Sequence, residues 1–136
     1  MIYLDSSAVV KLVHNEVGTA ELVGWLRRHA NNPLVSSALV EVEVPRALRR
    51  YAPTALAGVP AVLARLYRVE IDATIRATAA AFQDASLRSL DAIHLATAHL
   101  LRSESTETLE AFVAYDRRLL LAAAAIGMPV VSPGLS

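Results

Sequence analysis

Four acidic residues occupy positions that a parallel α/β fold would bring to one edge of its sheet. They are Asp5, Glu43, Asp91 and Asp116. Asp5 and Asp116 give the clearest signal, because each follows a short apolar run and precedes a helical pattern. Since the carboxyl ends of parallel strands share one rim, both residues are expected there. Carboxylates gathered at that rim would hold a divalent cation such as Mg²⁺ or Mn²⁺.

Each of these aspartates also has an ordinary structural explanation. Aspartate is favoured at helix N-termini, where it accepts a backbone N–H and suits the helix dipole. Their joint placement nevertheless favours a site. Asp91 begins a helical run so apolar that its carboxylate is expected to be largely buried, and a buried carboxylate needs a partner. Because only His94 among basic residues follows Asp91 at helical spacing, a cation from outside the chain is the expected partner.

Strands and helices alternate along the chain and would position these acids. Apolar patterns predict strands at about 1–4, 34–36, 67–72, 111–115 and 129–131, and helices at about 6–14, 18–29, 37–51, 53–66, 74–84, 90–102 and 117–125. Ser89 is the expected N-cap of the helix from 90. The strand from 67 alternates, which predicts a half-buried strand with Tyr67 and Val69 on one face. The predicted fold class is α/β, a three-layer αβα sandwich with a mainly parallel central sheet, in a single domain over residues 1–136.

Composition narrows the possible functions. The chain has 136 residues, 54% of them apolar, which is enough for a full core. A formal net charge of zero argues against broad nucleic-acid binding, so any RNA contact is expected to be local. There is no cysteine, which excludes disulfides and thiolate metal sites and favours a cytoplasmic location. No secretory signal is expected. The longest apolar run, residues 119–126, is too short to cross a membrane, so no membrane partner is expected.

Four segments set the acids in a specific context: IYLDSSA at 2–8, EVPRAL at 43–48, SLDAIHLA at 89–96 and AYDRRL at 114–119. In this order they resemble the acidic motifs of PIN-domain ribonucleases, and within them the VapC-type toxins of toxin–antitoxin pairs. The segment at 89–96 is the most specific match, and the resemblance spans nearly the whole chain. It implies a PIN-like fold and a metal-dependent endoribonuclease in which Asp5, Glu43, Asp91 and Asp116 are catalytic and bind Mg²⁺ or Mn²⁺.

The resemblance also implies partners: an RNA substrate, a small antitoxin protein whose tail blocks the acidic cleft, and a second copy of the chain in a homodimer. Ser7 follows Asp5 by two positions, and we expect it either to hydrogen-bond a metal ligand or to cap the helix. Arg46 and Arg117 lie close in sequence to the proposed ligands. Their guanidinium groups are candidates to hold the scissile phosphate, and solvated helix faces are the alternative.

The second acidic motif leaves a choice open. Glu41 and Glu43 would point about 200° apart on a helix, so only one can face the site. The family's spacing to Arg46 favours Glu43. Pro45 lies within the predicted helix, where it removes a hydrogen bond to the carbonyl of Glu41 and is expected to kink or restart the helix. Such a break would displace Glu43.

Two other functions fit part of the pattern. A Mg²⁺-dependent phosphatase would also place an aspartate after the first strand, but such enzymes usually carry Asp-x-Asp and a lysine near the last strands. This chain has Asp5-Ser6-Ser7, and its one lysine is Lys11. A non-catalytic RNA-binding module is the alternative if Glu43 is displaced. His94 and His99 lack the spacing of a zinc-binding helix and are expected to be structural or surface groups, and no glycine-rich nucleotide motif occurs.

Overall fold

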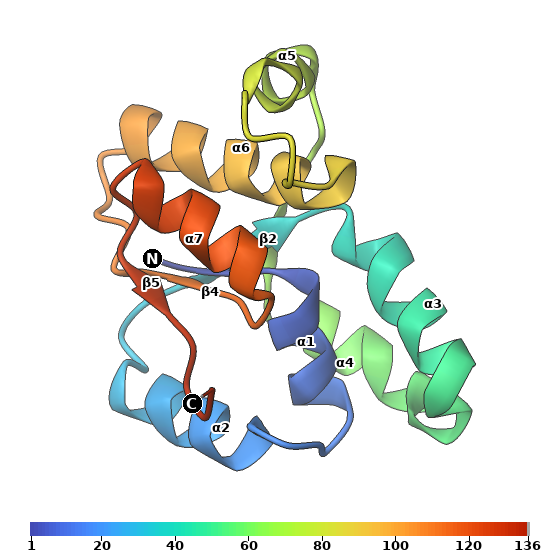
Figure 1. The fold of residues 1–136 in the computed structure, drawn as a ribbon. Helices are drawn as coiled ribbons and strands as arrows, with labels where there is room; N and C mark the ends of the chain where they lie inside the picture. The colour runs from blue at the N-terminus through green and yellow to red at the C-terminus, as the bar shows by residue number, and fades with distance from the viewer. Residues whose placement is uncertain (136) are drawn as a thin grey trace.

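The two central strands of the sheet, at residues 2–4 and 111–113, are short and fully buried because helices cover both of their faces. A computed structural model describes residues 1–135 (Figure 1). It contains a five-stranded sheet in the order β3-β2-β1-β4-β5, with every neighbouring pair parallel. The strands are β1 (Ile2–Leu4), β2 (Leu34–Ser37), β3 (Tyr67–Val69), β4 (Ala111–Val113) and β5 (Val130–Val131). The predicted α/β sandwich with a parallel sheet is confirmed.

Alternate residues of the central strands enter two separate cores. Ile2 and Leu4 of β1 face one core, and Tyr3 between them faces the other. The first core packs against α1 (Ser6–Val13), α2 (Thr19–Arg28), α3 (Val40–Tyr51) and α4 (Val59–Leu63), with a 3₁₀ helix η1 (Pro53–Gly58) before α4. The second packs against α6 (Ser89–Glu104) and α7 (Arg117–Ala125). Helix α5 (Ala73–Ala81) packs on α6, on the side away from the sheet (Figure 1).

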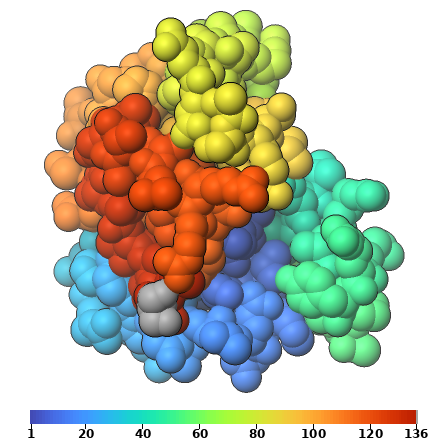
Figure 2. Space-filling view, viewed as in Figure 1, coloured from blue at the N-terminus to red at the C-terminus, as the bar shows by residue number. Residues whose placement is uncertain are grey.

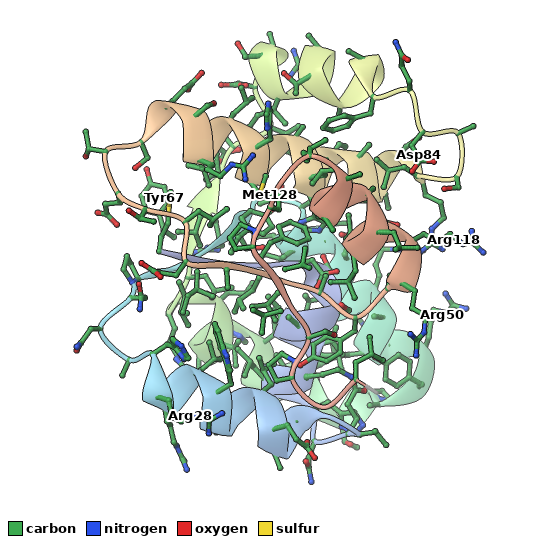
Figure 3. All side chains as sticks on the ribbon, turned by 60° about the vertical axis from the view of Figure 1, so that its left-hand side comes forward. Arg28, Arg50, Tyr67, Asp84, Arg118 and Met128 are labelled. Atoms are coloured by element: carbon green, nitrogen blue, oxygen red, sulfur yellow. The ribbon has the colours of Figure 1, made fainter. Side chains whose placement is uncertain are left out.

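Three local expectations are wrong. Ser89 is the first residue of α6 and does not cap it, since Arg88 occupies the N-cap position without a side-chain bond. The helix expected from residue 37 begins at Val40, because Ser37 still belongs to β2. Tyr67 is 70% exposed and not on a buried face (Figure 3). The reason is that β3 is an edge strand, with a neighbouring strand on one side alone.

Helix α3 continues through Pro45 from Val40 to Tyr51. The expected restart of the helix at Pro45 is therefore wrong. The helix holds because Val44 and Leu48, one turn apart, are both fully buried in the first core, and this packing compensates for the one backbone hydrogen bond that proline cannot make. Within residues 1–135, no helix has the length and apolar character needed to span a membrane.

Candidate active site

A pocket of about 350 Å³ lies at the carboxyl ends of β1 and β4. The surface is hollowed where the blue amino-terminal segment, teal α3 and orange α7 meet (Figure 2). Each of its walls comes from a different part of the chain: the β1–α1 junction, α3, the start of α6 and the β4–α7 junction. The lining residues are Asp5, Ser6, Ser7, Glu43, Arg88, Asp91, His94, Tyr115 and Asp116.

The structure brings together all four acids that the sequence singled out. Between the two candidate glutamates, Glu43 lines the pocket, whereas Glu41 lies outside it with a carboxylate oxygen 3.6 Å from the Arg68 guanidinium. Arg46 and Arg117, the two arginines expected to hold phosphate, are exposed and are not among the lining residues. The arginine that lines the pocket is Arg88.

Asp5 is buried at the end of β1, with 4% of its surface exposed. Its Oδ1 accepts hydrogen bonds from the Ser7 hydroxyl at 2.7 Å and the Ala8 amide at 3.0 Å, so it caps α1 as the sequence allowed. Burial raises the pKa of Asp5, although His94 and these hydrogen bonds act in the opposite direction. Among the residues that the structure describes, none donates to Oδ2. One oxygen is thus fixed by the fold, and the other is left for a ligand.

Glu43 projects from α3, and, as in Asp5, one of its carboxylate oxygens is held by hydrogen bonds and the other is not. Its Oε1 accepts from the Ser6 hydroxyl at 2.5 Å and lies 2.9 Å from His94 Nε2. Burial acts to raise the pKa of Glu43, but the hydrogen bonds from His94 and Ser6 outweigh it, and the pKa is lowered. Within residues 1–135, Oε2 accepts no hydrogen bond. The carboxylate therefore stays ionised with one oxygen available.

Asp91 and Asp116 share a single cation of the chain. The Arg88 guanidinium places Nε 3.3 Å from Asp91 Oδ2 and Nη2 3.4 Å from Asp116 Oδ2. Asp116 also caps α7, accepting from the Leu119 amide at 3.0 Å. Asp91 is largely buried, as expected, with 17% of its side chain exposed, but the expectation that it lacks a cation of the chain is wrong, because Arg88 lies three residues before it. Burial still raises the pKa of Asp91, despite Arg88.

The pocket's donor set fits a hard divalent cation. All four acidic side chains offer carboxylate oxygens, which Mg²⁺ and Mn²⁺ prefer over nitrogen or sulfur. The Arg88 guanidinium between Asp91 and Asp116 already places one positive charge where a metal cation would bind. Across residues 1–135, no three His, Asp or Glu side chains lie close enough together to form a preorganised metal site. A cation would therefore have to draw the carboxylates together.

Four pocket residues received no functional role from the sequence: Ser6, Arg88, His94 and Tyr115. His94 lies three residues after Asp91 on α6, and Arg88 lies three residues before it. Because residues three apart in a helix are neighbours, this spacing could have indicated from the sequence that both residues lie near Asp91. Tyr115 forms a wall, with its hydroxyl donating to the Pro133 carbonyl at 2.8 Å. Burial raises the pKa of Tyr115 to about 12, so its hydroxyl remains protonated.

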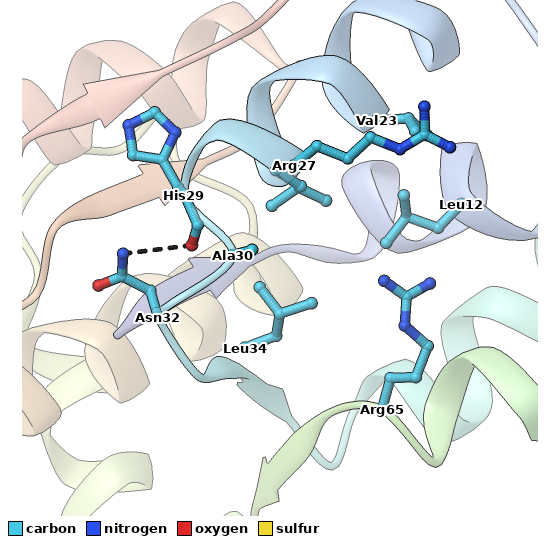
Figure 4. A pocket seen from close by; sticks show the side chains of 9 residues that line it. Leu12, Val23, Arg27, His29, Ala30, Asn32, Leu34 and Arg65 are labelled. Carbon is cyan, nitrogen blue, oxygen red and sulfur yellow. Dashed lines mark hydrogen bonds between the residues drawn. The ribbon is translucent and has the colours of Figure 1, made fainter.

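A second cavity, of about 320 Å³, lies between α2 and the amino end of β2 (Figure 4). Arg27 and Arg65 enter it from different elements, and Leu12 and Leu34 lie between them. It contains no carboxylate and lies at the opposite end of the strands from Asp5. The chemistry of the acidic pocket has no counterpart there.

Comparison with known proteins identifies the family of this chain. The family model of the PIN domain matches residues 2–125. This chain belongs to the PIN-domain family. The PIN domain is 52% identical over 134 residues to Ribonuclease VapC35 of Mycobacterium tuberculosis, covering 98% of both chains. It is 40% identical to Ribonuclease VapC46 of the same organism, covering 97% of both.

Solved structures share the fold of this PIN domain. A toxin–antitoxin complex from Klebsiella pneumoniae aligns with a TM-score of 0.73 at 23% identity, over the full length of both chains. VapC20 of Mycobacterium tuberculosis, a toxin that cleaves the sarcin-ricin loop, aligns with a TM-score of 0.66 at 16% identity, over 94% of this chain and 96% of that one. At these identities the likeness extends to the fold alone.

Proposed function

We propose that this PIN domain is an endoribonuclease that depends on Mg²⁺ or Mn²⁺ and acts as the toxin of a toxin–antitoxin pair. The observation that carries the proposal is the convergence of four acids, from four separate segments, on one pocket. The full-length similarity to Ribonuclease VapC35 supports the ribonuclease activity.

Asp5, Glu43, Asp91 and Asp116 would hold the cation. When bound, it would supply a water of lowered pKa as the nucleophile and neutralise charge on the leaving oxygen. The protein's own contribution is orientation. Ser7 and the Ala8 amide fix one oxygen of Asp5, and the Leu119 amide fixes one oxygen of Asp116, which leaves the other oxygen of each carboxylate for the cation once Arg88 has turned away from Asp116.

Arg88 is the residue best placed to contact an RNA phosphate. Its side chain is 66% exposed while its guanidinium reaches two pocket carboxylates, so it can turn from them toward an incoming phosphate. Planar guanidinium groups bind phosphate oxygens in pairs. Arg46 and Arg117, which do not line the pocket, would contact RNA nucleotides farther from it. A single arginine at the pocket fits the formal net charge of zero. A chain without net positive charge is expected to attract RNA locally and not over a broad surface.

The toxin role requires an antitoxin. One solved neighbour is a toxin–antitoxin complex and another is VapBC2 from Rickettsia felis bound to promoter DNA, which supports a small protein partner for this chain. A homodimer and a cytoplasmic location, where RNA is available, complete the proposal. The Arg88 contacts also illustrate how an arginine of a partner could occupy the acidic pocket.

The phosphatase alternative finds little support in the pocket. Lys11 binds Glu16 at 3.0 Å and the Val17 carbonyl at 2.9 Å, and no lysine is among the pocket's lining residues. Purified protein should therefore cleave RNA with Mn²⁺, stop when the metal is chelated, and leave p-nitrophenyl phosphate intact. Turnover of the phosphomonoester without RNA cleavage would contradict the nuclease proposal. RNA binding without either reaction would favour the non-catalytic module.

A further inference from the structure

A buried chain of hydrogen bonds connects the core to Glu43. The Tyr3 hydroxyl, on β1, lies 2.8 Å from His94 Nδ1, and His94 Nε2, on α6, lies 2.9 Å from Glu43 Oε1 on α3. Tyr3 is fully buried and His94 is 1% exposed. Three elements far apart in sequence thus meet through one imidazole ring.

The chemistry of Glu43 determines where the His94 proton must be. An ionised carboxylate only accepts hydrogen bonds, so Nε2 has to carry the proton that faces Oε1. In the tautomer that carries this proton on Nε2, Nδ1 has none and accepts from the Tyr3 hydroxyl. The two other hydroxyls near Tyr3 do not compete as donors, because Ser36 donates to the Leu4 carbonyl and Thr97 to the Ile93 carbonyl.

The core fixes the position of the Tyr3 hydroxyl. The Tyr3 ring stacks on Phe112 with ring centroids 5.3 Å apart and meets the edge of His94 at 5.9 Å. His94 is therefore oriented by a rigid neighbour and not by solvent. Ser6 adds a second donor to the same Glu43 oxygen and also lies 3.0 Å from Nε2. Oε1 is held from two sides, which directs Oε2 toward the pocket.

We propose that His94 is a positioning residue: Tyr3 holds it as the tautomer protonated on Nε2, and it orients Glu43 for cation binding. The inference rests on the proposed function, since Glu43 matters only if the pocket binds a cation. Partners of this kind behind metal ligands typically change metal affinity by about 10- to 100-fold when removed.

The tautomer can be measured on the metal-free protein by long-range ¹H–¹⁵N NMR spectra of the histidine side chains. The expected result is a proton on His94 Nε2 and none on Nδ1. Tyr3→Phe keeps the stacked ring and removes only the hydroxyl, so it should change the His94 Nδ1 shift and leave that of His99 unchanged. A proton on Nδ1 in the wild-type protein would overturn the inference.

Mn²⁺ affinity, measured by calorimetry, then separates positioning from mere packing. His94→Met removes the donor and should weaken Mn²⁺ binding about 10- to 100-fold. His94→Gln retains an N–H that can reach Glu43 and should restore most of the affinity. His99→Gln, on the same helix but outside the pocket, is the matched control and should bind as the wild type does. If His94→Met does not fold, Tyr3→Phe takes its place, with a smaller loss expected.

The outcomes distinguish this inference from the proposed function. Wild-type protein that binds no Mn²⁺ contradicts the metal-dependent nuclease, and the inference with it. Wild-type binding together with unchanged affinity in folded His94→Met contradicts the positioning role alone. Equal losses in His94→Gln and His94→Met also contradict it, because packing would then explain both.

Discussion

Replacing Arg88 with glutamine should tighten metal binding and at the same time slow RNA cleavage. In the metal-free protein the Arg88 guanidinium contacts Asp91 at 3.3 Å and Asp116 at 3.4 Å. A cation that uses these carboxylates has to displace it. Removing Arg88 removes this competition, whereas the loss of a guanidinium at the pocket weakens the hold on an RNA phosphate.

The size of the effect follows from exposure. Arg88 is 66% exposed, and solvent-exposed ion pairs contribute about 0.2–1 kcal/mol each. Two pairs together therefore oppose metal binding by about 0.4–2 kcal/mol. Since about 1.4 kcal/mol corresponds to a factor of ten, Arg88→Gln should bind Mn²⁺ about 2- to 30-fold more tightly. The gain should shrink in high salt, which screens exposed charges.

Calorimetric titration of metal-free protein with Mn²⁺ measures this gain, and initial rates on a short RNA at saturating Mn²⁺ give kcat/KM. Arg118→Gln is the control, because it removes the same charge from an arginine that points outward and is not among the pocket's lining residues (Figure 3). If Arg88→Gln binds Mn²⁺ no more tightly than Arg118→Gln, the competition between Arg88 and the cation does not exist. An unchanged kcat/KM would refute the phosphate contact.

Further predictions concern the acids themselves. Glu43→Gln should lose RNA cleavage, whereas Glu41→Gln, outside the pocket, should retain it; equal activities in a cleavage assay would remove Glu43 from the site. Because burial raises the pKa of Asp5 above its ordinary value of 3.8, the folded state binds this proton more tightly than the unfolded state. The contribution of Asp5 to stability is therefore present at low pH and lost as pH rises through its raised pKa. Thermal unfolding of metal-free protein should show that Asp5→Asn removes this decline, and an identical pH dependence in both proteins would contradict it. Leu48→Ala, in the first core, should lower the free energy of unfolding by about 2–5 kcal/mol in a denaturant titration; a loss below about 1 kcal/mol would mean that α3 is not held by this packing.

Much of the fold was predictable because the strands and helices have distinct periods. Asp5 and Asp116 could be placed at one rim from the ends of their strands alone, and the structure brings them to one pocket. The exposure of Tyr67 could not be predicted, since alternation within a strand does not reveal that the strand lies at an edge of the sheet.

The partners of the acids were harder to predict than the acids. His94 reaches Glu43 across 51 positions of sequence, and no local pattern reports such a tertiary contact. Arg88 precedes its helix, so its direction depends on the loop that leads into α6. Pro45 was expected to disturb α3, but burial of Val44 and Leu48 keeps the helix in place.

If the acids of this pocket bind the metal with which the protein cleaves RNA, replacing them with amides should abolish cleavage. RNA cleavage by Asp5→Asn and Asp91→Asn across a range of Mn²⁺ concentrations tests it most directly. Each amide keeps the shape of the carboxylate it replaces and relieves like-charge repulsion, so both variants should remain folded. Neither variant should cleave RNA at any Mn²⁺ concentration at which the wild type is fully active. Cleavage at the wild-type rate by both folded variants would contradict it.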